Sequence, residues 1–279
     1  MRPAAVLTAA LCLLTGTVAW AHDSWFATLP TPRATEVRLA LGTGARFPKL
    51  ESSVGALALA AHGCRHGVAP PVPLRIQRDT MTALQLRAHP VSTRSLAAAH
   101  GAITCWAQLV PFEVEIPPAI VELYFKEIQP PEAVREAWRE MLARGVTWKE
   151  RYTKHVRIER YDPRLGSAEP PAATAVPMGL DIVRDGPLRP PTAGDVISFQ
   201  VLRDGQPLAD FALELQSDWT PIGIWLQTDA QGRARVRLAR QGGYLLRGVD
   251  LRLSTTVPDA WESRFVMLGF EAAASPLSR

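Results

Sequence analysis

Residues 196–201 (VISFQV) and 233–238 (RARVRL) decide the fold class, because each segment places an apolar side chain at every second position. Such alternation is typical of a β-strand with one face in a core and one face in water. In the second segment Ala234, Val236 and Leu238 are expected to face inward. The three arginines between them are expected to form a solvated strand face rather than an anion site.

Turn sequences separate these strands at short intervals. Asp204-Gly205 and the segment 229–232 (DAQG) suit the backbone of tight turns, since Asp-Gly pairs accept positive φ angles. Short strands with a turn every eight to twelve residues are typical of a β-sandwich. The Pro-rich segment 169–174 precedes this region and reads as a linker. We therefore expect two units, residues 22–169 and residues 170–279.

The first unit is also rich in alternating segments, but it includes a helical pattern. Pro-Pro-Glu at 130–132 is a typical helix start, and Val134, Trp138, Met141 and Leu142 would form one apolar stripe. Gly145 is expected near the end of that helix. A second helix is expected from Trp148, Tyr152 and Val156, which recur at four-residue spacing. The predicted fold is mainly β, with two immunoglobulin- or transthyretin-like sandwich domains and a small helical insertion near 130–158.

The composition excludes several classes of protein. The 279 residues are 47% hydrophobic and 21% charged, which is typical of an ordered chain with a substantial core. Basic and acidic residues number 31 and 27, so the near balance does not suggest nucleic-acid binding. No nucleophile elbow, phosphate loop, dinucleotide fingerprint or zinc-protease helix motif occurs in the sequence. We therefore do not expect an enzyme.

The first 21 residues have the pattern of a secretory signal peptide. Arg2 precedes an apolar run at 4–18, and Ala19-Trp20-Ala21 is a small-residue cleavage site. Cleavage after Ala21 would send the chain to the periplasm. An uncleaved membrane anchor is the alternative, and the Ala-x-Ala ending favours cleavage. No other stretch is long and apolar enough to cross a membrane.

Cleavage would also leave two cysteines, Cys64 and Cys105, because Cys12 lies within the leader. Two cysteines in an oxidising compartment usually form one disulfide. The alternative is that both thiolates ligate a metal ion.

His22 would be the first residue of the mature chain. An N-terminal histidine offers its α-amine and its ring Nδ1, which together can close a six-membered chelate on a metal ion. Nitrogen ligands suit copper, nickel, cobalt or zinc, and the amine loses its proton near neutrality. The chelate would be absent from the precursor, so cleavage would create it. Asp23 follows directly and is expected to ligate the metal or to orient the ring.

The remaining histidines give weaker signals. His62 and His66 flank Cys64 and are alternative metal ligands, although a Gly/Ala-rich surface loop held by Cys64 is the favoured interpretation. His89, His100 and His155 are isolated along the chain and are expected on the surface.

Several segments resemble a secreted bacterial family of unknown function that is associated with nickel and cobalt uptake (NikM- or NikK-like). The similarity covers most of the mature chain and is strongest in 179–271. The matching segments are 21–26 (AHDSWF), 148–154 (WKERYTK), 179–183 (GLDIV), 194–195 (GD), 204–209 (DGQPLA), 228–234 (TDAQGRA), 243–247 (GYLLR) and 261–263 (WES).

This resemblance implies a periplasmic protein in two parts, with a sandwich as its C-terminal domain and with membrane components of metal uptake as partners. Asp250 stands where many relatives carry histidine. If that position ligates, oxygen replaces nitrogen here, and affinity for softer metals falls.

Three functions are compatible with these observations. The first is a periplasmic protein that binds nickel, cobalt or copper through His22, with Asp250 or another histidine completing the site. The second is a metal-free module that binds a glycan, peptide or protein partner through loops of its sandwiches. The third, an oxidative copper enzyme, would need a second histidine beside the first, and the sequence identifies none.

Overall fold

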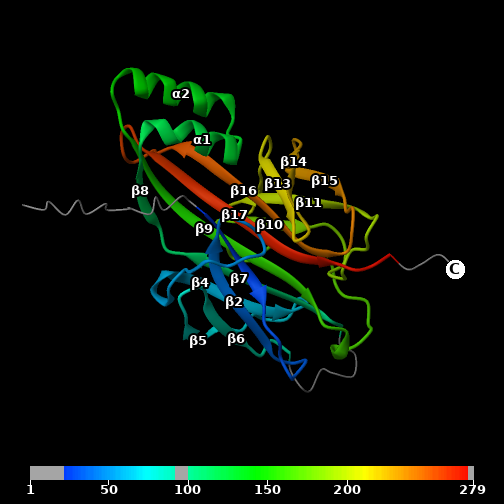
Figure 1. Ribbon diagram of the computed structural model, residues 1–279. Helices are drawn as coiled ribbons and strands as arrows, with labels where there is room; N and C mark the ends of the chain where they lie inside the picture. Colours follow the sequence, from blue (N-terminus) through cyan, green and yellow to red (C-terminus); the bar gives the residue numbers. More distant parts are fainter. Residues whose placement is uncertain (1–21, 92–99, 276–279) are drawn as a thin grey trace, which may run out of the picture.

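The computed structural model describes residues 22–91 and 100–275 and is mainly β, with 52% of the residues in strands. Three sheets account for these strands, and two α-helices pack at one end of the molecule (Figure 1). None of the helices in the described ranges is long and apolar enough to cross a membrane.

The largest sheet has eight strands and runs through the centre of the molecule (Figure 1). Its order is β14-β13-β16-β17-β9-β7-β4, and β8 pairs with β9 beyond the path of the others. β17 runs parallel to β9, whereas the other pairs are antiparallel. The strands are β4 (Leu59–His66), β7 (Ala102–Leu109), β8 (Phe112–Ile116), β9 (Trp148–Tyr161), β13 (Ala212–Ser217), β14 (Thr220–Gln227), β16 (Gly242–Leu253) and β17 (Trp261–Ala272).

Two smaller sheets flank it. The five-stranded sheet consists of β1 (Asp23–Thr28), β2 (Val37–Gly44), β3 (Ser52–Ser53), β5 (Arg75–Asp79) and β6 (Leu84–Ala88). The four-stranded sheet consists of β10 (Leu180–Arg184), β11 (Val196–Arg203), β12 (Gln206–Pro207) and β15 (Arg233–Arg237). The alternating segments 196–201 and 233–238 therefore belong to β11 and β15, which pair with each other.

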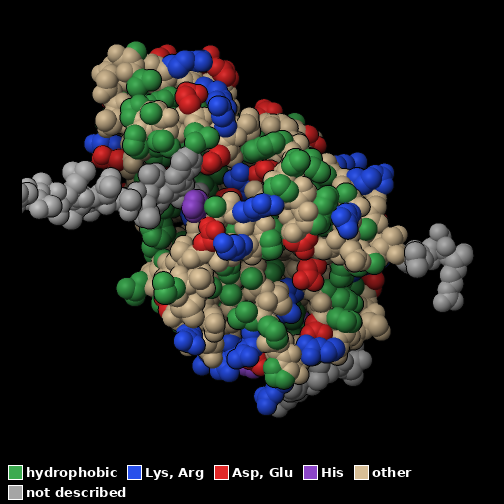
Figure 2. Space-filling model, in the orientation of Figure 1, with side chains coloured by type: hydrophobic (Ala, Val, Ile, Leu, Met, Phe, Trp, Pro, Cys, Tyr) green, Lys and Arg blue, Asp and Glu red, His purple; other side chains and the backbone are tan. Residues whose placement is uncertain are grey.

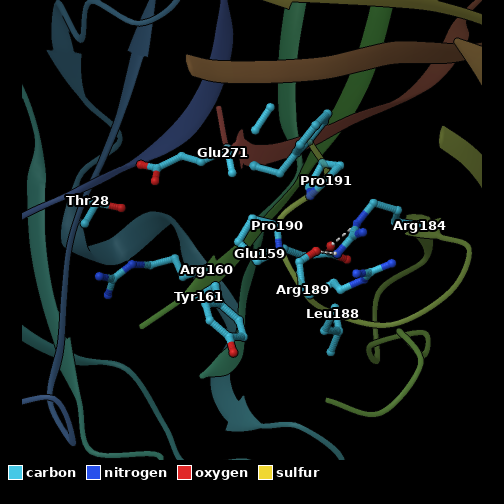
Figure 3. A pocket seen from close by; sticks show the side chains of 13 residues that line it. Thr28, Glu159, Arg160, Tyr161, Arg184, Leu188, Arg189, Pro190, Pro191 and Glu271 are labelled. Atoms are coloured by element: carbon cyan, nitrogen blue, oxygen red, sulfur yellow. Dashed lines mark hydrogen bonds and ion pairs between the residues drawn. The ribbon is translucent and has the colours of Figure 1, made fainter. Parts of the chain in front are cut away.

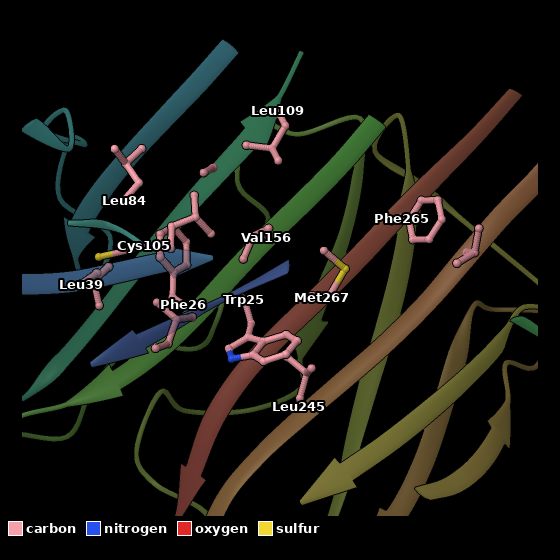
Figure 4. Packing of buried hydrophobic residues seen from close by; sticks show 14 of the residues in the cluster. Trp25, Phe26, Leu39, Leu84, Cys105, Leu109, Val156, Leu245, Phe265 and Met267 are labelled. Carbon is pink, nitrogen blue, oxygen red and sulfur yellow. The ribbon is translucent and has the colours of Figure 1, made fainter. Parts of the chain in front are cut away.

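The central sheet is buried on both faces, as β17 illustrates. Phe265 and Met267 belong to the core cluster shared with the five-stranded sheet (Figure 4). Val266, Leu268 and Phe270 belong to the cluster shared with the four-stranded sheet. A strand buried on two faces needs apolar residues at consecutive positions, which is why 265–268 show no alternation.

The eight-stranded sheet also joins strands from both sides of residue 170. β9 precedes that residue and pairs directly with β17, which follows it. The division of the chain at residue 170 therefore stays a prediction, and the two cores share one sheet.

The helices are α1 (Pro118–Ile128) and α2 (Glu132–Ala143), with short 3-10 turns at Ala56–Ala58 and Pro163–Leu165. The helix is confirmed as α2, which ends two residues before Gly145, and its stripe is confirmed in part. Trp138 and Met141 are buried and Val134 packs against the core, but Leu142 is 45% exposed.

The helix expected at 148–156 is wrong, since these residues belong to β9. A spacing of four is also a multiple of the two-residue period of a strand, so Trp148, Tyr152 and Val156 share one face in either structure.

Cys64 on β4 and Cys105 on β7 lie directly opposite each other and form a disulfide, with a Cα–Cα distance of 4.0 Å. The disulfide prediction is confirmed, and the thiolate-ligand alternative is wrong. The surface loop expected around Cys64 is also wrong, because residues 59–66 form a strand of the central sheet.

Candidate functional site

His22 lies immediately before β1, where Lys154 of β9 holds its backbone. The Lys154 ammonium donates to the His22 carbonyl oxygen at 2.5 Å and reaches the Ser24 hydroxyl oxygen at 3.3 Å. The Ser24 hydroxyl in turn hydrogen-bonds Thr43 of β2 at 2.9 Å. The first residue of the predicted mature chain is therefore tied to both the central and the five-stranded sheets.

Lys154 is a buried cation, and no carboxylate of residues 22–91 or 100–275 forms an ion pair with it. Only 5% of it is exposed, and burial lowers its pKa to about 8, with the charge of Asp23 acting in the opposite direction. The rings of Tyr152 and Phe265 lie 5.7 and 5.9 Å from its ammonium, within the range of cation–π attraction. Its hydrogen-bond acceptors are neutral, so the His22 carbonyl is a principal partner.

Asp23 is committed to an ion pair. Its carboxylate lies 3.0 Å from the guanidinium of Arg247 on β16, which also lies 2.6 Å from Glu214 and donates to the Glu127 carbonyl oxygen at 3.1 Å. A carboxylate that helps to neutralise a largely buried arginine is a poor additional metal ligand, because metal binding would weaken one of the two ion pairs of that cation. The geometry favours a positioning role for Asp23 over a ligating role.

Two carboxylates that interact electrostatically with His22 were not anticipated from the sequence. The Glu51 pKa is lowered mainly by the hydrogen bond that Ala45 N–H donates, and the charge of His22 acts in the same direction. The Glu127 pKa is raised by burial, with the charges of Arg247 and His22 opposing that rise. Glu51 precedes β3 and Glu127 ends α1, so no local motif connects either residue with His22.

Asp250 is not brought to His22. It lies on β16 three residues after Arg247, and side chains alternate between the faces of a strand, so the two point to opposite sides of the sheet. Its carboxylate lies 2.7 Å from Arg203 and 2.9 Å from Arg252. In this structure Asp250 neutralises two arginines.

His62 and His66 are not brought together either. Four residues of extended strand separate them by about 13 Å. His66 instead packs against His100, with ring centroids 4.3 Å apart, and its Nε2 donates to the His100 carbonyl oxygen at 2.6 Å.

The other isolated histidines divide into exposed and buried positions. His89 is exposed, as expected. The prediction of a surface position is wrong for His155, which is 1% exposed. Its Nδ1 donates to the Phe265 carbonyl oxygen at 3.0 Å, and burial lowers its pKa to about 4.

Two further polar clusters on β9 are explained by stability. Arg157 lies 3.0 Å from Glu159 and 2.9 Å from Asp181, and Arg184 lies 2.9 Å from Glu159. The Glu159–Arg184 pair borders a cavity of about 210 Å³ between β9 and the segment that follows β10 (Figure 3). Each charge in this network faces an opposite charge, as buried ions require.

Glu150 forms the other cluster, beneath the helices. Its carboxylate accepts hydrogen bonds from Tyr124 of α1 and from the Trp148 indole, both at 2.9 Å, and from the Ser263 hydroxyl. Burial raises the Glu150 pKa, and these three donors oppose that rise. Glu150 and Lys154 both belong to the segment 148–154 that carries the family resemblance, and both bind neighbouring elements to β9.

The part of the chain that the structure describes contains no ready-made group of three or more His, Cys, Asp or Glu side chains in metal-binding geometry. The chelate expected at His22 would rely on the α-amine, which is a backbone group of the processed chain. Lys154 donates to the His22 carbonyl oxygen, and the carboxylates of Glu51 and Glu127 interact with His22 through their charges.

Comparisons with known proteins add no family. No family model matches the chain, and no curated protein does. One similar solved structure is described as "Crystal structure of tetra-tandem repeat in extending region of large adhesion protein", with 8% identity and a TM-score of 0.22. The match covers 90% of this chain, and the chain spans about half (49%) of that structure. The resemblance to the nickel and cobalt uptake family stays a prediction.

Proposed function

We propose that the processed protein binds a transition-metal ion of the nickel, cobalt or copper type through His22. The observation that carries this proposal is the hydrogen bond from Lys154 to the His22 carbonyl oxygen. This contact fixes the backbone of His22 while it leaves the amine and the ring free of that restraint. A chelate whose backbone is already ordered pays less conformational entropy when it binds its ion.

The chemistry of the surrounding donors fits this class of metal. An amine and an imidazole supply two nitrogens, and the carboxylates of Glu51 and Glu127 offer oxygen. The Lys154 cation acts against metal affinity, but its lowered pKa lets it lose its proton at modest cost.

The proposal includes the compartment and the architecture. Cleavage after Ala21 would expose the chelate in the periplasm, where membrane components of metal uptake would be the partners. We further propose that the three sheets form two sandwiches that share the central sheet, because each core cluster contains residues from that sheet and from one flanking sheet.

The test is a metal titration of protein processed at Ala21, with its N-terminus verified by mass spectrometry. Nickel, cobalt and copper salts are titrated by calorimetry into three variants: His22→Ala, the chain with one added glycine before His22, and His89→Ala as an exposed control. We expect the first two variants to lose at least about tenfold in affinity, or about 1.4 kcal/mol. The control should match the unmodified protein.

The glycine extension is the sharper of the two changes, because it keeps the imidazole, converts the His22 amine into a peptide nitrogen and moves the free amine one residue away. Equal affinities for the extended and unmodified chains would contradict the chelate. Loss with His22→Ala but not with the extension would indicate a ring-only ligand and would also contradict it.

A second candidate function, a metal-free interaction module, is favoured by one observation. The edge strand β14 of the central sheet exposes large apolar side chains.

A further inference from the structure

β14 is the outermost strand at one end of the eight-stranded sheet and pairs with β13 alone. At a free edge, every second residue has an N–H and a C=O group without a strand partner. Such an edge can be extended by another strand.

The side chains on this edge are large and apolar. Ile222 is 76% exposed, Ile224 48% and Trp225 40%, and Trp219, just before the strand, is 42% exposed. In Figure 2 hydrophobic side chains gather over the region of β13 and β14. Ile224 shares a strand face with Leu226, which packs against the core cluster of the four-stranded sheet. The core of this half of the molecule therefore reaches the surface at β14.

The edge carries only part of the usual protection against pairing. Natural edge strands carry charge, proline, bulges or a covering segment. Residues 220–227 (TPIGIWLQ) contain no charged side chain, whereas Pro221 and a register shift against β13 interrupt the start of the strand, so the regular ladder covers 224–227. An uncharged strand pairs with itself without like-charge repulsion.

We infer that β14 pairs with β14 of a second copy of this chain, antiparallel across a two-fold axis, so that the central sheet continues through the dimer. Charges at the two ends of the strand fit this arrangement. Arg240 lies over the Trp219 ring at 5.3 Å, beside the start of β14, and Asp229 lies two residues beyond its end. Neither side chain has an ion-pair partner within the described ranges. Antiparallel pairing brings the start of each strand to the end of the other, so Arg240 of one copy would lie near Asp229 of the second copy.

The exposed area fits a weak dimer. A fully exposed aromatic or large aliphatic side chain presents about 150–250 Å², so the four side chains together expose about 400 Å². Two copies would bury at most about 800 Å² of this side-chain area, which lies in the range of weak, transient interfaces. The dimer population should therefore depend on protein concentration.

The experiment is sedimentation velocity over an about hundredfold range of concentration. The unmodified protein should shift from monomer to dimer, and Ile222→Lys should weaken dimerisation by at least about tenfold, because the two-fold axis brings the new charges together. Met81→Lys is the matched control, since Met81 is 92% exposed but lies between β5 and β6 of another sheet. Thermal unfolding verifies that each variant folds.

A single added cysteine tests whether β14 lies at the dimer interface. Because the native cysteines Cys64 and Cys105 are already joined, Ile224→Cys should form a cross-linked dimer under mild oxidation, and Met81→Cys should not. A monomer at every concentration would overturn the inference. Equal loss with Ile222→Lys and Met81→Lys would overturn it too, as would cross-linking of Met81→Cys at the rate of Ile224→Cys. Capture of a different protein by a β14 that does not self-associate would replace the second copy with another partner.

Discussion

β9 and β14 belong to the same sheet, but the inner strand β9 buries charged side chains and the edge strand β14 exposes apolar ones, the reverse of the usual distribution. β9 lies inside the sheet and buries Glu150, Lys154, Arg157 and Glu159. β14 lies at the edge, carries no charge and exposes isoleucine and tryptophan. The difference shows that position in a sheet does not by itself determine polarity.

Polar groups of neighbouring elements explain why β9 can bury charged side chains. Glu150, Arg157 and Glu159 lie opposite ions or donors from β10, α1 and β17, whereas Lys154 donates to neutral acceptors at His22 and Ser24. Such groups destabilise a fold only when one partner is removed. For β14 the compensating surface is the second copy proposed above. The contrast predicts large effects for charge removal from β9 and small effects for apolar removal from β14 in the monomer.

The largest effect is expected for Arg157→Met. Arg157 has a fully buried side chain, and its loss leaves Asp181 buried with only the Val176 N–H as a donor. We expect the free energy of unfolding to fall by about 3–5 kcal/mol. Urea unfolding at neutral pH measures it.

The double variant Arg157→Met/Asp181→Asn provides the control, because it removes the stranded carboxylate as well. It should recover part of the lost stability. If the single and double variants were equally unstable, lost packing rather than unpaired charge would be the cause.

The next largest effect is expected from Lys154, which should make the free energy of unfolding depend on pH. Its pKa is about 8 in the folded protein and about 10.4 in an unfolded chain. Between these values the unfolded state binds more protons, so this residue makes stability rise with pH across about 8 to 10.4. The gain is about 3 kcal/mol when complete.

The comparison variant is Lys154→Met, which keeps an unbranched side chain against Tyr152 and Phe265. The difference in unfolding free energy between the unmodified protein and this variant should change across that pH window. A constant difference would mean that Lys154 does not titrate there.

Much of the fold could be predicted because local periodicity reflects burial. β11 and β15 each have one buried face, so their alternation was readable. β9 was misread because four-residue spacing fits a helix as well as a strand. α1 was missed although its buried residues Val121, Tyr124, Phe125 and Ile128 have helical spacing, and a proline stands at its start.

The candidate site was only half predictable, for a different reason. His22 followed from the cleavage motif next to it. Lys154 lies 132 residues further along the chain and approaches His22 only because β1 packs against β9. That contact is a property of the topology, which no local pattern encodes. The same reasoning applies to Asp250, whose face of β16 depends on the strand register.

The smallest effect is expected for Ile222→Thr in β14. At low protein concentration the substitution should change the unfolding free energy by no more than about 0.5 kcal/mol, because the side chain is mostly exposed and threonine also favours strands. Ile182→Thr in β10 is the matched buried control and should cost about 2 kcal/mol, since it removes a methyl group from the core and buries a hydroxyl. At high concentration a dimer through β14 would couple association to folding, so the cost of Ile222→Thr should then increase while that of Ile182→Thr stays the same. Urea unfolding at the two concentrations measures both, and a cost of Ile222→Thr that does not depend on concentration would contradict the pairing of β14.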